Sequence, residues 1–421
     1  MTKDERNPPE GDRWTFYEAV RTSEDEGAFM REVVIVSAVR TAIGKFGGKL
    51  SSVPAAQLGE IVVKELLARA KIRPDKVDEV IMGNVLEARL GKNPAGQAAV
   101  RAGISQYSPS FTVSKVCGAG MKSIFLAAQT IKSGDAEIVV AGGMENMSEA
   151  TFLLQKTPGP LPTESEGAVG IMIRDGLWCS LGDSRKGITS EDVGEKFGIS
   201  RKEQDEYAAR SHQKAETAIT SGRFKDEIVP VKVRQKDGDP LTCDTDENPR
   251  FGATPETLAK LDPIFGKDGT ITAGNSSAVA DGAVALVIMS AEKAYSMGIK
   301  PMAKLTGYDY HWSEPELMGY GPIYAVRSAL HKVWAGIDKK IELIELNETF
   351  AAQSIVSLRE LNLDPEIVNV NGGAIALGHP MGSSGARILT TLLYEMQRRD
   401  VKVGLAAGMG IACIVEREWY F

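Results

Sequence analysis

The feature that most constrains this 421-residue chain is an internal repeat that is too long to belong to a solenoid. Residues 113–148 and residues 368–413 each read as an apolar strand, a glycine-rich turn, an amphipathic helix and a second strand. The second strands end in similar segments, Ala-Gly-Gly-Met at 141–144 and Ala-Ala-Gly-Met at 406–409. The repeat therefore predicts two related α/β halves that pack face to face.

Strands and helices alternate through both halves, which is typical of α/β units with a largely parallel, covered sheet. We predict an N-terminal half over residues 32–146 and a C-terminal half over residues 300–421. Residues 147–279 lack this rhythm and are predicted to be an insertion, after which residues 280–299 return to the first half. Residues 1–31 mix acids, bases and Pro-Pro without an apolar core, so we expect an N-terminal extension rather than a signal or transit peptide.

Composition and charge exclude several classes of function. The net charge of -7 provides no basic footprint of the kind that nucleic acids need. No apolar run approaches the roughly 20 residues of a membrane-spanning helix. The 4 cysteines and 4 histidines are scattered, which argues against a zinc site and against a secreted disulfide framework. We therefore expect a cytoplasmic protein without a metal, a nucleic-acid partner or a membrane partner.

Cys117 lies between the strand and the helix of the first repeat. The apolar residues that follow it fall on one helical face, and Gly134 stands where a helix-ending glycine belongs. The helix is therefore predicted to begin near Gly118, with Cys117 at its N-terminus. Unpaired N–H groups and the helix dipole favour a thiolate there. A buried structural cysteine is the alternative interpretation of the same residues.

The second repeat places His379 in the turn that Cys117 occupies in the first. Asn347 ends a predicted strand of the same half. If the halves are related by a pseudo-two-fold axis, both turns meet at one site. Cysteine, histidine and asparagine together suit a thiolate nucleophile, a general base and an oxyanion site.

These segments resemble the thiolase family, the acyl-CoA C-acetyltransferases, over residues 32–416. The matching motifs are VSAVRTAIGKFGG, VCGAGMKS, GGMENMS, DGLW, TAGNSSAVADGA, MGYGP, NETF and GGAIALGHPMGSSGAR. The resemblance implies two thiolase halves in a layered αβαβα fold, with an inserted loop domain that holds coenzyme A. It implies thiolysis of a 3-ketoacyl-CoA, or the reverse condensation of two acyl-CoAs, by a homodimer or homotetramer that uses coenzyme A as a substrate and needs no cofactor.

The resemblance also implies roles for single residues. The acyl group is expected on Cys117, His379 is expected to activate the thiol, and Asn347 is expected to hold a water in the oxyanion hole. A further set is expected to border the substrate: Ser277, Met318, Arg185, Lys186 and Gly410. Arg185 and Lys186 replace a His-Met pair of the family, so they change the pocket or favour an acidic acyl group.

The chain departs from the family near its C-terminus, where most thiolases carry a second catalytic cysteine. Counting back from the turn at 408–410, that position holds Gly404, and we interpret Cys413 as a core residue. The loss removes a proton carrier from the carbon–carbon step, in which general acid–base catalysis contributes about 10²–10⁴-fold. Water or Thr349 is a possible relay.

Three hypotheses stay open. The one we favour is a working thiolase. The second is an acyltransferase or thioesterase that loads Cys117 without carbon–carbon chemistry. The third is a non-catalytic subunit that binds coenzyme A.

Overall fold

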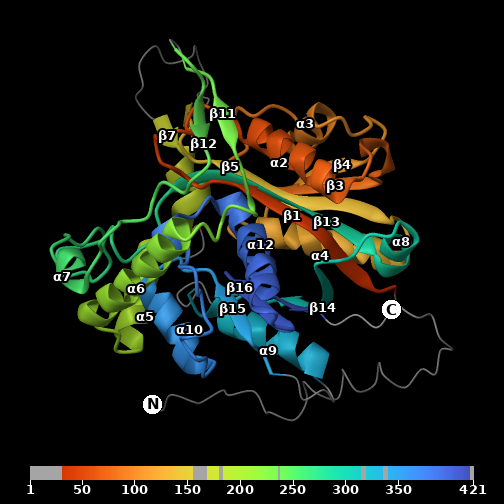
Figure 1. Ribbon diagram of the computed structural model, residues 1–421. Coiled ribbons are helices and arrows are strands. Elements are labelled where there is room, and N and C mark those ends of the chain that lie inside the picture. Colours follow the sequence, from red (N-terminus) through yellow and green to blue (C-terminus); the bar gives the residue numbers. More distant parts are fainter. Residues whose placement is uncertain are drawn as a thin grey trace, which may run out of the picture.

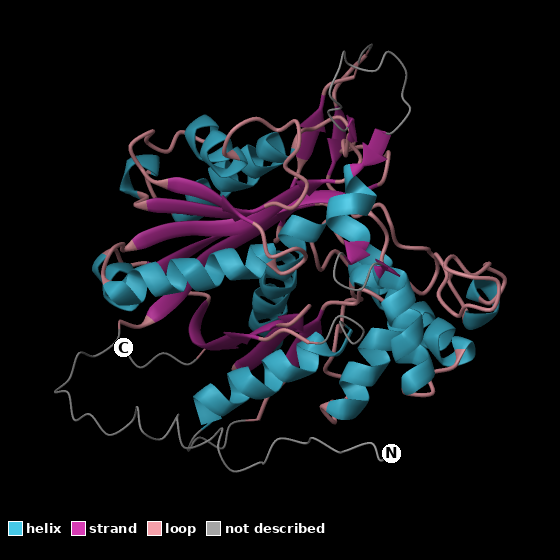
Figure 2. Cartoon of the chain, turned by 180° about the vertical axis from the view of Figure 1, so that it is seen from behind, coloured by secondary structure: helices cyan, strands magenta, loops and turns pink. Residues whose placement is uncertain are grey.

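The computed structural model of the chain describes residues 31–154, 168–179, 184–235, 238–313, 319–334 and 340–417. Helices and strands alternate in layers, and two groups of strands are separated by helices (Figure 1; Figure 2). Helices α2 (Ala55–Ala70) and α3 (Pro94–Arg101) cover one outer face, and α9 (Gly321–Trp334) lies on the opposite side. Helices α4 (Ala119–Ser133) and α12 (Met381–Arg399) run between the two groups of strands. The predicted αβαβα arrangement is confirmed.

The first group of strands follows the order β4-β3-β5-β13-β1. Its members are β1 (Val33–Thr41), β3 (Glu79–Gly83), β4 (Ser110–Val113), β5 (Ile138–Asn146) and β13 (Ala280–Ser290). Strand β3 is parallel to both β4 and β5, whereas β13 is antiparallel to both β5 and β1. The prediction of a largely parallel sheet was therefore wrong. Asp281 pairs with Asn146, so the long segment between them leaves and re-enters the sheet at one end and forces an antiparallel pair.

The second group of strands repeats this plan. It contains β14 (Ala303–Tyr310), β15 (Leu343–Leu346), β16 (Val403–Gly408) and β17 (Ile411–Glu416) in the order β15-β16-β17-β14. A parallel bridge from Ile344 to Val368 extends it beyond β15, where the first group has β4. Strand β15 is parallel to β16, and β17 is antiparallel to β16 and β14. The same order and directions in both groups confirm the two related halves.

Within the described residues, strand pairing joins the two groups at one edge. Val34 pairs with Lys304 and Ile35 pairs with Ala303, where β1 meets β14. Elsewhere α4 and α12 fill the space between the groups, so the two halves are joined mainly by side-chain packing. One continuous apolar cluster contains residues from β1, β5, β13, α4, α12, β16 and β17.

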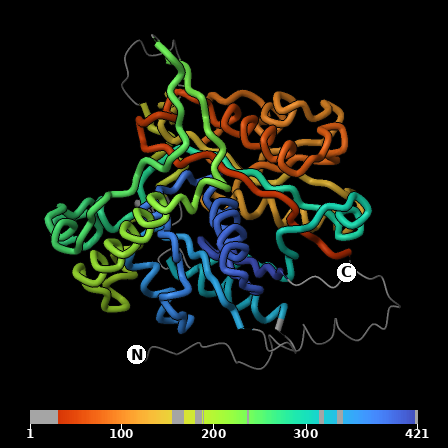
Figure 3. Tube along the Cα trace, in the orientation of Figure 1, coloured from red at the N-terminus to blue at the C-terminus, as the bar shows by residue number. Residues whose placement is uncertain are grey.

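The residues between β5 and β13 form a helical cluster beside α10 (Ala351–Glu360) and several small hairpins, of which β11–β12 projects from the molecule (Figure 3). The elements of this segment are β6 (Phe152–Leu154), β7 (Ala168–Gly170), the π-helix η2 (Met172–Leu177), β8 (Trp178–Cys179), β9 (Ser184–Arg185), α5 (Lys186–Lys196), α6 (Arg201–Thr220), β10 (Ile228–Val229), β11 (Val231–Val233), β12 (Leu241–Cys243) and α7 (Pro255–Leu258). Short elements elsewhere are β2 (Gly44–Lys45), the 3-10 helix η1 (Pro74–Lys76), α8 (Ala291–Ser296) and α11 (Ala374–Leu377).

Helix α4 forms as its sequence predicted. Its N-cap is Gly118, and Gly134 ends it with φ +86°, a conformation that glycine adopts without strain. The predicted apolar face is completely buried: Met121, Ile124, Phe125, Ala128 and Ile131 are all 0% exposed. Burial of that face against the strands and α12 holds the helix, and thereby the turn before it, in place.

Helices α4 and α12 approach each other closely because glycines lie at their crossing. A Cβ atom on Gly120 would lie 2.9 Å from the carbonyl oxygen of Gly382, and one on Gly143 would lie 2.1 Å from the same oxygen. A Cβ atom on Gly83 would lie 2.7 Å from it as well. Gly120 and Gly382 are each the second residue of their helix. The turns that precede the two helices therefore meet at the same end of the molecule.

We expect the variant Gly143→Ala to be destabilised strongly, because the new methyl group has a fixed position and meets backbone atoms of Gly382 and Ser383 on α12. Overpacking of this kind typically costs about 1–3 kcal/mol and more where backbone must shift. The matched control is Gly266→Ala, since a Cβ atom there has no neighbour within 4 Å. Urea unfolding of both variants measures the difference. Equal free energies of unfolding would contradict the tight contact.

Candidate active site

Cys117 lies in a tight turn directly before α4. The N–H of Gly118 donates to the carbonyl of Lys115 at 3.0 Å, and the N–H of Ala119 donates to Val116 at 3.0 Å. Val116 adopts φ +49°, a left-handed conformation that β-branched residues rarely adopt, so its surroundings must hold the turn. Cys117 itself is 5% exposed. The structure therefore places this sulfur at a helix N-terminus, as the sequence predicted.

A cavity of about 260 Å³ opens beside Cys117. From the C-terminal half, Thr349, Met409 and Gly410 line it. The two-residue turn between β16 and β17 consists of Met409 and Gly410, with φ +47° and +69°, and this turn faces the cavity. The site thus lies between the halves, and the predicted residue Gly410 forms part of its wall.

Asn347 follows β15 and is 1% exposed. Its side-chain N–H₂ donates to the hydroxyl of Thr349 at 3.2 Å and approaches the sulfur of Met409 at 3.3 Å. Both partners line the cavity. Within the described part of the chain, the buried oxygen Oδ1 of Asn347 has no hydrogen-bond partner. An unsatisfied buried acceptor is costly, so this oxygen is suited to a water or a ligand group.

His379 lies between α11 and α12 and is 5% exposed. Its backbone N–H donates to the carbonyl of Ala278 at 2.9 Å, and Nδ1 lies 2.6 Å from the hydroxyl oxygen of Ser384. The Ser384 hydroxyl hydrogen is directed at the carbonyl of Pro380, at 2.9 Å. The hydroxyl oxygen must therefore accept from Nδ1–H, which leaves the lone pair of a neutral imidazole on Nε2.

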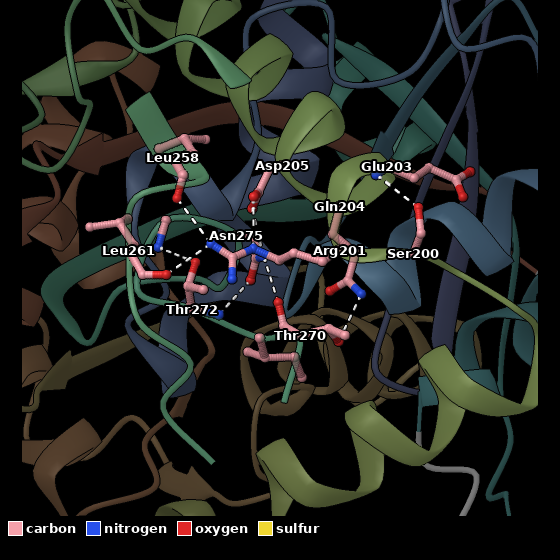
Figure 4. A network of polar contacts seen from close by, with 12 residues as sticks. Ser200, Arg201, Glu203, Gln204, Asp205, Leu258, Leu261, Thr270, Thr272 and Asn275 are labelled. Carbon is pink, nitrogen blue, oxygen red and sulfur yellow. Dashed lines mark hydrogen bonds and ion pairs between the residues drawn. The ribbon is translucent and has the colours of Figure 1, made fainter. Parts of the chain in front are cut away.

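Ser277 connects the turns of His379 and Asn347 through its backbone. Its N–H donates to the carbonyl of Thr349 at 3.0 Å, and the next residue, Ala278, accepts from His379. The loop before Ser277 is fixed to the start of α6 (Figure 4). Asn275 donates to Asp205 at 2.9 Å, and Asp205 forms an ion pair with Arg201 at 2.7 Å. The inserted segment therefore positions Ser277 rigidly.

Arg185, Lys186 and Met318 are the remaining predicted site residues. Arg185 pairs in a hairpin with Trp178, which lines the cavity, so the backbone of Arg185 and the adjoining Lys186 runs close to it. Met318 lies outside the described residues. The predictions for these three side chains stay predictions.

Counting along the sequence places the expected second cysteine at Gly404, but this position points away from the cavity. A Cβ atom on Gly404 would lie 2.4 Å from the sulfur of Met396 and 3.1 Å from Leu392, both on α12. Position 404 therefore faces the core, and not the cavity. Cys413 is 0% exposed, and burial raises the pKa of its thiol to about 12. Such a thiol stays protonated, in agreement with its interpretation as a core residue.

Sequence reasoning missed Glu145, a carboxylate buried at the end of β5. Its oxygens accept from the backbone N–H of Gly382 at 2.9 Å, from that of Leu86 at 3.2 Å and from the side chain of Asn84 at 2.8 Å. It therefore ties the end of β3 to the first turn of α12. The pKa of Glu145 is raised to about 7, mainly by burial; the N–H donors lower it and the nearby charge of Cys117 raises it. The sequence signal that could have indicated Glu145 is a charged residue near the end of an otherwise apolar strand.

No helix within the described residues combines the length and the apolar character that crossing a bilayer requires. No group of three or more histidine, cysteine, aspartate or glutamate side chains gathers there in a way that could hold a metal ion.

Comparison with known proteins identifies the family. The family described as "Thiolase, N-terminal domain" matches residues 33–292, and "Thiolase, C-terminal domain" matches residues 299–417. The chain is 50% identical to an acetyl-CoA acetyltransferase of Pseudomonas aeruginosa over 394 residues, which is 92% of this chain and 100% of that one. It is also 50% identical to an acetyl-CoA acetyltransferase of Escherichia coli over 397 residues, again 92% and 100% of the two chains.

A solved structure agrees with these relatives. The crystal structure of the Bacillus anthracis acetyl-CoA acetyltransferase matches with a TM-score of 0.88 and 40% identity, and the match covers 92% of this chain and 99% of that one. The chain therefore belongs to the thiolase family, as its motifs indicated. It is an acyltransferase.

We expect the pH dependence of stability to report on Glu145. Its pKa rises from 4.5 to about 7 on folding, so the native state binds this proton more tightly than the unfolded chain does. The free energy of unfolding should therefore fall as the pH rises through this window. Replacement by glutamine removes that contribution.

Urea unfolding of the wild type and of Glu145→Gln at about pH 5 and about pH 7.5 tests this expectation. Other buried carboxyls titrate in both proteins. The test is therefore whether the free energy of unfolding changes by different amounts in the wild type and in the variant between the two pH values. The wild type should lose more stability than the variant on going to the higher pH. Parallel slopes would show that Glu145 does not titrate in this range.

Proposed function

We propose that the protein is an acetyl-CoA acetyltransferase that cleaves acetoacetyl-CoA with coenzyme A and runs the reverse condensation. The observation that carries this proposal is the close approach of the first turns of α4 and α12, the helices that follow Cys117 and His379, together with a cavity of about 260 Å³ that Cys117 lines. The names of the relatives supply the substrate.

In the first half-reaction Cys117 acts as the nucleophile. His379 takes the thiol proton on Nε2, because Ser384 occupies Nδ1. The thiolate attacks the keto carbon of the substrate, and the acyl group then stays on sulfur as a thioester. The N-terminus of α4 stabilises the negative charge on sulfur before the attack.

Asn347 supports the same step through its unsatisfied oxygen. Oδ1 accepts a hydrogen bond from a water, and that water donates to the substrate oxygen on which negative charge develops. Thr349 and Met409 hold the amide in the required orientation, since both contact its nitrogen.

Coenzyme A is a substrate in this proposal and leaves with the second acyl group. The segment 147–279 forms the domain that binds it, with Ser277 beside the pantetheine arm. Met318, Arg185 and Lys186 border the acyl group. The protein works in the cytoplasm as a homodimer or homotetramer, with halves at 32–146 plus 280–299 and at 300–421, and needs no metal.

The orientation of Gly404 favours one alternative function. Because position 404 faces α12, no side chain there can move a proton in the cavity. An acyltransferase or thioesterase that loads Cys117 without carbon–carbon chemistry is consistent with this geometry. It differs from the proposed function in a single property, the cleavage of acetoacetyl-CoA.

The steady-state rate of acetoacetyl-CoA thiolysis tests the proposed function. The wild type should consume acetoacetyl-CoA and coenzyme A, and Cys117→Ser should lose at least about 10³-fold in kcat because a serine hydroxyl is not ionised by the same base. Cys243→Ala is the matched control, since Cys243 lies in the β12 hairpin and does not line the cavity. This control should keep the wild-type rate.

Two results would contradict the proposal. One is a wild type that does not cleave acetoacetyl-CoA at all. The other is a Cys117→Ser variant whose kcat equals that of the wild type, because the acyl group would then travel through another residue.

A further inference from the structure

The carbon–carbon step needs a proton carrier besides the base that serves Cys117. When the bond is cleaved, its electron pair leaves as an enolate that must be protonated at carbon. In condensation a base must remove the same proton. His379 is directed by Ser384 to exchange the thiol proton, which belongs to a different atom. A second group that exchanges protons near neutral pH is therefore required beside the cavity.

The cavity offers few such groups. Among its lining residues that the structure describes, those with titratable side chains other than Cys117 are Lys115, Asp175 and His311. The hydroxyl of Thr349 is a very weak base, and the ordinary pKa of an aspartic acid side chain, about 3.9, makes its carboxylate a weaker base than an imidazole. Histidine is the side chain that gains and loses a proton most readily near neutral pH.

Lys115 is better suited to stabilising an anion than to moving a proton. Its ammonium group lies 5.8 Å from the ring centroid of Tyr310 and 5.4 Å from that of Trp312. Both rings favour the charged form of the lysine. Burial lowers the pKa of Lys115, and the neighbouring Lys122 lowers it further, whereas the charge of Cys117 raises it.

His311 is fixed in a position and a tautomer that suit a base. It follows β14, and its backbone N–H donates to the carbonyl of Gly410 at 2.8 Å, at the hairpin turn that lines the cavity. Its Nδ1 lies 2.7 Å from the carbonyl oxygen of Trp312. A carbonyl only accepts hydrogen bonds, so Nδ1 carries the hydrogen and Nε2 carries the lone pair. The ring also packs against Tyr324 of α9, with the centroids 5.3 Å apart.

We propose that Nε2 of His311 delivers and removes the α-proton in the carbon–carbon step, an inference that rests on the proposed function. In cleavage the Cys117 thiolate forms a C–S bond to the keto carbon, and the C–C bond breaks. Its electron pair leaves as the enolate of acetyl-CoA, and the His311 imidazolium gives its Nε2 proton to the enolate carbon. Coenzyme A then takes the acyl group from Cys117, and its thiol proton restores the imidazolium. Condensation runs through the same bonds in reverse.

The variant His311→Gln tests whether His311 moves the α-proton, because two reactions of the same enzyme can be compared in it. Exchange of labelled coenzyme A into acetyl-CoA needs only the loading and unloading of Cys117. Thiolysis of acetoacetyl-CoA needs the carbon–carbon step as well. We expect thiolysis to fall by about 10²–10⁴-fold and exchange to stay at the wild-type rate. His331→Gln, which changes an exposed histidine of α9, is the matched control and should alter neither reaction.

The other outcomes overturn the inference. If His311→Gln retains thiolysis, another group moves the proton. If it loses thiolysis and exchange equally, His311 has a structural role only. If Thr349→Val shows the selective loss and His311→Gln does not, the hydroxyl is the relay. A wild type that exchanges label but does not cleave acetoacetyl-CoA refutes the proposed function itself, whereas cleavage by both wild type and variant refutes only the role of His311.

Discussion

The carbonyl oxygen of Gly382 occupies space that any side chain on Gly120 or Gly143 would need, and this close approach joins the two halves of the molecule. It lets the N-termini of α4 and α12 lie against each other. Cys117 and His379 lie in the turns that lead into these two helices. Glu145 reinforces the contact, because it accepts hydrogen bonds from both the N-terminal half and the first turn of α12.

Each part of the chain contributes different residues to the site, and this geometry explains why. From the N-terminal half Cys117 lines the cavity, and from the C-terminal half the turn at Met409 and Gly410 does, with Asn347 in contact with the sulfur of Met409. The inserted segment holds Ser277 between them through the network around Asn275 (Figure 4). A site at such a boundary can change its chemistry by altering one loop, while the layered framework stays intact.

Local patterns predicted much of this arrangement, and contacts between distant segments account for what they missed. The apolar face of α4 and Gly134 were sufficient to place the start and end of that helix, because both signals are local. The antiparallel position of β13 depends on where a long segment re-enters the sheet, which periodicity does not show. The direction of Gly404 depends on the register of β16 against α12, and counting residues along the chain could not reveal it.

The measurement that tests the account most directly is the mass of the peptide that carries Cys117 after reaction with acetoacetyl-CoA and an acid quench. An acetyl group on that peptide requires both a loaded thiol and a broken carbon–carbon bond, and it is the result that we predict. An acetoacetyl group alone would show that the thiol loads but that cleavage does not occur. An unmodified peptide would contradict the role of Cys117.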